Sequence, residues 1–204
     1  MKKIILTGFE PFAHYKYDPT QKSTHDFNGK IFGDREVIGV TLPAVYESWG
    51  HLIHTIQTTN PYAIIGTGLA SSAQGMRIES VFRNVKNGKY PDADGYAPKN
   101  IPILTDPNAP ATVTVRCKNV KLFKLLREND IPVEFSKDAD RFICNALGYY
   151  ISTASRYGPY SFKTLFVHIP WTTEYKDKVF LEEGKNFLET DLYYKGLELL
   201  IRNI

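Results

Sequence analysis

The sequence predicts an α/β fold with one central sheet and helices on its faces. Strand-like apolar runs alternate with helix-periodic segments, and this alternation is typical of α/β layer architectures. Several of the runs are apolar at almost every position, as expected of strands that are covered on both faces. The chain has 204 residues, of which 43% are hydrophobic and 23% charged, so it can bury a sizeable core. We therefore expect a single domain over residues 1–204, and two small domains are the second interpretation.

The expected strands are short apolar runs bounded by turn residues. The first runs into a turn that contains glycine and proline, and the last ends directly before Ile169-Pro170. The runs at 78–85 and 111–115 are expected to form further strands or irregular extended segments. The five expected strands are residues 3–6, 36–41, 62–66, 131–135 and 164–168.

Four segments place their apolar side chains on one stripe at helical spacing. Proline and asparagine residues lie at the ends of the first two, where they favour helix starts and stops. The expected helices are residues 45–56, 120–126, 143–154 and 187–201. Between residues 86 and 110 the chain is rich in Gly, Pro, Asn and Asp, which predicts a long surface loop that serves as a lid, a binding loop or an interface arm.

Composition and charge exclude several classes of protein. The formal net charge of +3 is small and evenly spread, which argues against binding to nucleic acid or to an anionic membrane. No apolar stretch is long enough to span a bilayer, and the apolar run after Lys2-Lys3 is too short for a signal peptide. A cytoplasmic location is therefore expected.

The chain has only two cysteines, Cys117 and Cys144, so a disulfide scaffold is not implied, although one bond between them stays open. No cysteines and histidines have the spacing of a structural zinc site. His51 and His54 would need carboxylate partners to bind a metal, and solvated helix-face histidines are the simpler interpretation. We expect neither a metal nor another cofactor.

Cys144 is the first candidate for chemistry. It lies in the run Arg141-Phe142-Ile143-Cys144-Asn145 at the start of the third expected helix. The positive end of a helix dipole favours the thiolate, which is the nucleophilic form of cysteine. The alternative is a buried core cysteine, the commoner fate of an isolated cysteine. Cys117 follows an expected strand and has no histidine or helix start nearby, so we expect it to be inert.

His168 and Glu79 are the candidates to complete a catalytic triad with that thiol. His168 ends a buried apolar run directly before Ile169-Pro170, at the sheet edge where the sites of α/β proteins gather. Glu79 lies near the start of another extended run, and a third group commonly orients the imidazole of a thiol–imidazole pair. The alternatives are a buried histidine bonded to the backbone and a surface glutamate paired with Arg77.

An aromatic cluster follows the first expected strand. Phe9 and Phe12, in the run Thr7-Gly8-Phe9-Glu10-Pro11-Phe12, place large apolar side chains at the same edge of the sheet. There they could wall a pocket for a small flat ligand. A loop that only seals the core is the alternative.

Taken together, these pieces resemble the pyroglutamyl peptidase I family, also called pyrrolidone carboxyl peptidases, a family of cysteine exopeptidases. The resemblance covers nearly the whole chain and lies in the order and spacing of several short motifs. They are Thr7 to Phe12 followed by Pro19, Gly68-Leu69-Ala70, Ile78-Glu79 with Asn84, Cys144-Asn145, and Phe166-Val167-His168-Ile169-Pro170.

The resemblance implies a three-layer α/β/α sandwich of the phosphorylase/hydrolase type with a mixed central sheet. The substrate implied is a peptide with an N-terminal pyroglutamyl (5-oxoproline) residue, cleaved through a thioester acyl-enzyme. The family also implies a cytoplasmic enzyme without a metal, often a homo-oligomer such as a dimer or tetramer, with neither nucleic acid nor membrane as a partner. The residues implied are Glu79, Cys144 and His168 for catalysis, and Phe9, Phe12 and Asp18 for substrate binding.

Several positions depart from the family pattern. Asp18 replaces an asparagine before Pro19, and an ionised aspartate can accept a hydrogen bond from the lactam N–H but cannot donate to its carbonyl. Asp140 and Ala13 replace glycines, and Ser72-Ala73 replaces a Gly-Arg pair. Aspartate tolerates left-handed backbone geometry better than most residues. These changes leave open a related amidase or acyl hydrolase with altered preference, and a non-catalytic protein that binds pyroglutamyl groups.

Overall fold

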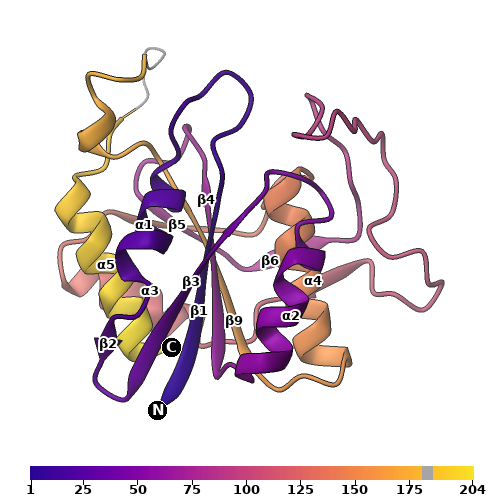
Figure 1. Cartoon of the computed structure of the whole chain (residues 1–204), viewed down its shortest axis with the longest axis horizontal. Helices are drawn as coiled ribbons and strands as arrows, with labels where there is room; N and C mark the ends of the chain where they lie inside the picture. Colours follow the sequence, from indigo (N-terminus) through magenta and orange to yellow (C-terminus); the bar gives the residue numbers. More distant parts are fainter. Residues whose placement is uncertain (181–185) are drawn as a thin grey trace.

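One seven-stranded sheet forms the centre of the computed structural model of the chain, which describes residues 1–180 and 186–204 (Figure 1). In spatial order its strands are β2 (Ile31–Phe32), β3 (Arg35–Leu42), β1 (Lys2–Phe9), β4 (Ala63–Leu69), β9 (Lys163–Ile169), β5 (Met76–Glu79) and β8 (Val133–Ser136). Four neighbours, β3, β1, β4 and β9, are parallel. The sheet is mixed because β2 is antiparallel to β3 and β5 is antiparallel to β9, while β8 is parallel to β5.

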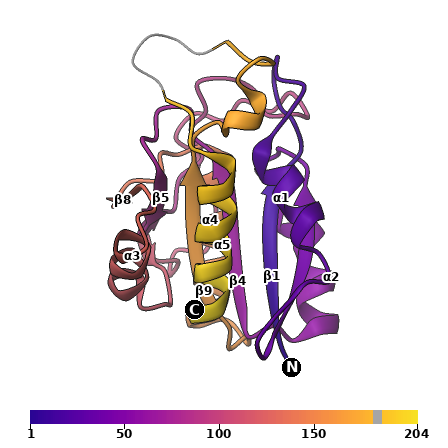
Figure 2. The same ribbon diagram turned by 90° about the vertical axis from the view of Figure 1, so that its left-hand side faces the viewer.

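Helices cover both faces of this sheet and make a three-layer α/β/α sandwich (Figures 1 and 2). One face carries α1 (Pro19–Phe27), α3 (Asn119–Glu128) and α5 (Thr190–Asn203), and the other carries α2 (Trp49–Thr59) and α4 (Ile143–Tyr157). The first strand shows how one sequence serves both layers. Ile4 and Leu6 pack with the first group of helices, whereas Ile5 packs with the second, because successive strand residues point to opposite faces.

The fold class predicted from the sequence is confirmed, and each of the five expected strands forms. The run at 78–85 is broken at Ser80 into β5 and β6 (Val81–Arg83). The second of these leaves the central sheet and pairs with β7 (Thr112–Thr114) in a separate two-stranded sheet. Residues 86–110 contain no helix or strand, only an isolated bridge between Lys86 and Ile101, as the loop prediction requires.

All four expected helices form, but two begin later than predicted. Turns occupy residues 45–48, so α2 begins at Trp49, and α5 begins at Thr190 rather than at 187. A single-turn 3₁₀ helix, η1 (Thr173–Tyr175), follows β9. Among the described residues, no helix is long and apolar enough to cross a membrane.

The sequence patterns missed β2 and, more importantly, α1. This helix buries small hydroxyl residues, Thr20, Ser23 and Thr24, where an apolar stripe would be expected, and only Phe27 is a large apolar residue. The reason is a close approach of α1 to the sheet: a side-chain carbon at Gly8 or Gly39 would collide with the backbone carbonyls of Thr20 and Thr24. Because no bulky side chain fits between helix and strand, hydrophobic periodicity could not reveal this helix.

Candidate active site

Cys144 is the second residue of α4 and lies at the carboxyl-terminal edge of the parallel strands. Buried Ile143 and Ala146 hold the first turn of the helix against the core. The backbone N–H groups of Ile143, Cys144 and Asn145 have no hydrogen-bond acceptor within the part of the chain that the structure describes. Such free groups and the helix dipole make the start of α4 a favourable place for negative charge.

His168 reaches the cysteine from β9, across from Gly68 of β4, with which it is paired in the sheet. A side-chain carbon placed on Gly68 would lie 2.6 Å from the Cys144 Sγ atom and 3.5 Å from the His168 Nε2 atom. The sulfur and the ring nitrogen therefore face the same small space above Gly68. Any residue larger than glycine would fill that space, so this glycine permits the contact between thiol and imidazole.

Glu79 ends β5, which runs antiparallel to β9. Its Oε1 atom lies 2.8 Å from the His168 Nδ1 atom, on the side of the ring away from the sulfur. Glu79 is fully buried, and its Oε2 atom has no hydrogen-bond partner within the described residues. A buried carboxylate aimed at Nδ1 fixes the ring with Nε2 toward the thiol. The surface position considered from the sequence is therefore wrong, and Arg77 pairs instead with Glu134.

The electrostatics of His168 follow from this arrangement. Burial of the ring lowers its pKa, but the neighbouring Cys144 thiolate and the Glu79 carboxylate together outweigh that effect and raise the pKa of His168 to about 9. At neutral pH the protonated imidazolium form of His168 is thus favoured. Cysteine, histidine and glutamate form one connected series of polar contacts.

An apolar slot of about 160 Å³ opens on one side of the Cys144 sulfur. Phe9 and Phe12 contribute aromatic walls, and the Phe12 ring lies 5.7 Å from the ring of Phe142. The sequence predicted the first two aromatic residues but not Phe142, although it is only two residues before the cysteine. The remaining lining residues are Glu10, Tyr15, Tyr17, Asp18, Ala44, Leu69 and Ile143.

Asp18 is the one buried carboxyl group in the wall of that slot. It caps the start of α1: its Oδ1 atom accepts hydrogen bonds from the Thr20 backbone N–H at 2.7 Å and from the Thr20 hydroxyl at 2.6 Å. Burial raises the pKa of Asp18 to about 6, although the hydrogen bonds from Thr20 act in the opposite direction. The Asp18 carboxyl group therefore changes between its neutral and its ionised form at a pH close to neutral.

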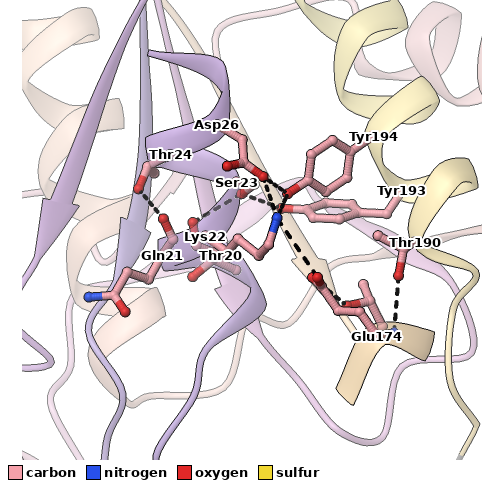
Figure 3. Close-up of polar contacts among 11 residues, drawn as sticks. Thr20, Gln21, Lys22, Ser23, Thr24, Asp26, Glu174, Thr190, Tyr193 and Tyr194 are labelled. Carbon is pink, nitrogen blue, oxygen red and sulfur yellow. Dashed lines mark hydrogen bonds and ion pairs between the residues drawn. The ribbon is translucent and has the colours of Figure 1, made fainter. Parts of the chain in front are cut away.

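A polar network holds α1, the helix that Asp18 caps, against its neighbours. Figure 3 shows the contacts that residues of α1 make in this network. The Ser23 hydroxyl lies 2.8 Å from the hydroxyl of Tyr193 on α5 and also donates to the backbone carbonyl of Thr20 at 3.0 Å. Further out, Lys22 pairs with Asp26 on the same helix and approaches Glu174 of η1 at 3.8 Å. The helix that lacks an apolar stripe is thus fixed by hydroxyl contacts and ion pairs.

A wider polar cleft of about 640 Å³ opens beside the same sulfur, and Leu69 and Phe142 line both this cleft and the apolar slot. Residues 87–90 of the long loop form one of its walls. The loop is tied down there, because the Asn87 N–H donates to the Arg141 carbonyl at 2.9 Å. Cys144 therefore lies between two recesses of different character.

Two departures from the family pattern have a backbone consequence. Asp140 and Ala13 both adopt left-handed geometry, with φ values of 63° and 59°. Glycine adopts this geometry without strain, aspartate adopts it at some cost, and alanine is disfavoured. Asp140 offsets part of the cost, because its Oδ1 atom accepts a hydrogen bond from the Arg141 N–H at 2.7 Å.

Other residues singled out by the sequence lie outside the chemistry. Asn145 is fully buried and clamps β6, accepting from the Arg83 N–H and donating to the Arg83 and Val85 carbonyls. Both cysteines are free thiols, and burial raises the pKa of Cys117 to about 12. His51 and His54 are exposed on α2, and no metal-binding group of acidic, histidine or cysteine side chains occurs among the described residues.

Comparisons with known proteins identify the family of the chain. The family model for pyroglutamyl peptidase matches residues 2–191. A pyrrolidone-carboxylate peptidase of Thermococcus litoralis is 32% identical over 211 residues, covering 99% of this chain and 92% of that protein, and one of Halalkalibacterium halodurans is 35% identical over 175 residues, covering 84% and 85%.

Solved structures give the same result. The pyrrolidone carboxyl peptidase of Thermococcus litoralis superposes with a TM-score of 0.91 at 29% identity, covering 99% of this chain and 92% of that one. The pyroglutamyl peptidase I of Bacillus amyloliquefaciens superposes with a TM-score of 0.90 at 26% identity, covering 100% and 96%. The chain therefore belongs to the pyroglutamyl peptidase family of hydrolases.

Proposed function

We propose that this protein hydrolyses the amide bond after an N-terminal pyroglutamyl residue, with Cys144 as nucleophile, His168 as general base and acid, and Glu79 as the group that orients the imidazole. One observation carries the proposal: the Cys144 sulfur lies between an apolar slot and the His168 ring, whose far nitrogen is bonded to Glu79 at 2.8 Å. Family membership supports the choice of substrate.

The reaction follows from these positions. His168 holds the proton of Cys144 as an imidazolium, and the thiolate attacks the carbonyl carbon that follows the lactam ring. The free N–H groups at the start of α4 stabilise the negative oxygen of the tetrahedral intermediate. The C–N bond then breaks, His168 gives its proton to the departing amine, and a thioester remains. His168 next takes a proton from water, and the resulting hydroxide attacks the thioester carbonyl carbon. The C–S bond breaks, which releases pyroglutamic acid and restores the thiolate beside the protonated His168.

The apolar slot accounts for recognition of the cyclised residue. A lactam ring carries no charge and packs on aromatic walls such as Phe9 and Phe12, whereas the free α-ammonium group of glutamine or glutamate would lose its hydration there. Asp18 supplies the polar contact. Its Oδ1 atom is occupied by Thr20, which leaves Oδ2 to accept a hydrogen bond from the lactam N–H.

Paired cysteine variants test this function. The wild-type protein should cleave a fluorogenic pyroglutamyl amide and leave the matching glutaminyl amide intact. Cys144→Ser should lower the rate at least about a thousandfold, since a hydroxyl is a far weaker nucleophile in a site built for a thiolate. The matched control Cys117→Ser should keep the wild-type rate within about twofold. If the wild-type protein shows no thiol-dependent turnover on several such amides, the proposal fails.

A second candidate function is hydrolysis of related amides or acyl groups with a different ring preference. Asp18 favours it, because an ionised carboxylate in the slot cannot donate a hydrogen bond to a lactam carbonyl. A panel of lactam and acyl amides separates the two candidates, and Asp18→Asn should then improve pyroglutamyl cleavage at the expense of the better substrate. A non-catalytic binding protein would instead show thermal stabilisation by pyroglutamate with an unreactive Cys144.

A further inference from the structure

A cationic cavity of about 780 Å³ lies at the opposite edge of the sheet from the cysteine. Its wall includes the first residues of β3 and β9 and the residue directly before β4, so it lies where the parallel strands begin. His168 is five residues further along β9 than the cavity residue Lys163, roughly 17 Å at the rise of a strand. This cavity is therefore separate from the candidate active site.

The charged side chains of the wall are all positive. Six of its fourteen residues are basic and none is acidic; the six are Arg35, Arg116, Lys118, Lys121, Arg156 and Lys163. None of the six pairs with an Asp or Glu side chain within the described residues. The rest of the chain has 19 of the 25 Lys and Arg residues and all 22 Asp and Glu residues, which gives it a net charge of −3. Basic residues that are spread along the sequence therefore gather, six together, around one hollow of the fold.

The arginines of the cavity are held in place by hydrogen bonds to main-chain and hydroxyl oxygens. Arg116 donates to the Ser155 carbonyl at 2.7 Å, and Arg156 donates to the Thr114 hydroxyl at 3.0 Å. Arg35 donates to a terminal oxygen of Ile204, the last residue, at 3.2 Å. Each guanidinium has five N–H groups, so further donors remain. The Arg35 Nε atom is buried and has no acceptor in the part of the chain that the structure describes.

Tyr62 brings three more cationic contacts together. Lys163 donates to its hydroxyl at 2.6 Å, and the amino groups of Lys163 and Lys2 lie 4.6 and 5.0 Å from the centre of its ring. Lys118 and Lys121 are exposed and make no side-chain hydrogen bond within the described residues. The cavity thus combines fixed guanidinium groups with free ammonium groups, which is the combination that grips phosphate oxygens.

We propose that this cavity binds a small, multiply charged phosphate compound. The anchored arginines and Lys163 bind the anion from the wall of the cavity, and the exposed Lys118 and Lys121 side chains then contact it from the solvent side. Several like charges around one hollow repel one another, and an anion of charge −3 or more relieves that repulsion. The shape favours a small molecule over nucleic acid, because the basic groups converge on a hollow instead of forming a stripe. The Tyr62 ring faces cations and is not free to stack on a base.

Titration calorimetry with inorganic triphosphate tests the proposal, with sodium sulfate at equal ionic strength as the reference anion. The wild-type protein should bind one triphosphate with a Kd below 1 mM and bind sulfate at least about tenfold more weakly. Lys121→Glu should weaken triphosphate binding at least about tenfold, the loss of one charge-assisted contact. The matched control Lys124→Glu makes the same charge change one turn further along α3, outside the cavity, and should stay within about twofold of wild type.

Two further measurements make the result decisive. Cys144→Ser should bind triphosphate with an unchanged Kd, because the cavity is independent of the proposed peptidase chemistry. Circular dichroism should show that both lysine variants remain folded. Equal losses in the Lys121→Glu and Lys124→Glu variants would reveal general charge attraction and overturn the proposal. Binding of a single-stranded oligonucleotide without binding of triphosphate would overturn it too.

Discussion

The substitution Gly68→Ala probes the contact between thiol and imidazole without removing any catalytic group. The new methyl carbon would lie 2.6 Å from the Cys144 Sγ atom and 3.3 Å from the nearest ring carbon of His168. An ordinary contact between such atoms is about 3.5–4 Å. Since β4 is held by parallel pairing with β9, the sulfur must move by about 1 Å. A displacement of that size costs about a hundredfold in rate.

Two assays report on this displacement. Turnover of a fluorogenic pyroglutamyl amide should fall about a hundredfold in kcat, and alkylation of Cys144 by iodoacetamide, followed by mass spectrometry, should slow as well. The second assay does not depend on the substrate being correct. The overpacked site should also lower the free energy of unfolding by about 1–3 kcal/mol.

Gly50→Ala is the matched control, because a side-chain carbon at Gly50 of α2 meets no atom within 4 Å. This variant should keep its activity within about twofold and be as stable as wild type or slightly more stable. The reasoning is refuted if Gly68→Ala turns over substrate within about threefold of the Gly50→Ala control. In that case the sulfur does not need the space above Gly68 to reach the ring.

Three other substitutions test the electrostatics and the backbone. Glu79→Gln removes a group that raises the pKa of His168 to about 9, so kcat should fall by about 10²–10⁴ and the alkaline limb of the pH–rate profile should move to lower pH. Asp18→Asn should raise the free energy of unfolding at pH 7, measured in urea, by up to about 3 kcal/mol. The pKa of Asp18 is about 6 in the folded state and lower in the unfolded state, so the wild-type protein loses stability as the pH rises from about 4 to 6. A stabilisation that persists unchanged at pH 3.5 would contradict this origin. Ala13→Gly should raise the free energy of unfolding by about 1 kcal/mol, because it relieves a left-handed φ of 59°, and a destabilised variant would show that the turn is not strained.

Much of the fold follows directly from patterns along the chain. The apolar runs around Ile4, Ile64 and Val167 are buried on both sheet faces, and apolar stripes predicted α2, α3, α4 and α5. Such patterns work because burial selects for hydrophobic residues at the period of each element. α1 was not predicted because its buried face consists mainly of hydroxyl groups packed against glycine positions of the sheet. Such a contact produces no periodic apolar pattern in the sequence.

Most residues of the candidate site could likewise be predicted individually from the sequence. Local features of the sequence predicted Cys144 at a helix start and His168 at a strand end. They also predicted the two phenylalanines at the end of the first strand and just after it. The resemblance to the family then assigned roles in the same site to Glu79 and Asp18. Phe142 had no signal of its own, although it directly precedes α4. The wall formed by residues 87–90 had none either, since these residues reach the site only through the path of a long loop.

The sequence by itself determined the layers of this protein and the chemical types available at the sheet edge, because hydrophobic periodicity and residue identity are local properties. Only the tertiary structure decided how those groups meet. The antiparallel pairing of β5 with β9 turns Glu79 toward the His168 ring, and a glycine in the neighbouring strand leaves room for the sulfur. Likewise, six basic residues scattered from position 35 to 163 become a single charged hollow only when the strand starts and helix ends come together. Distances between groups far apart in the chain are set by packing, and no local pattern encodes them.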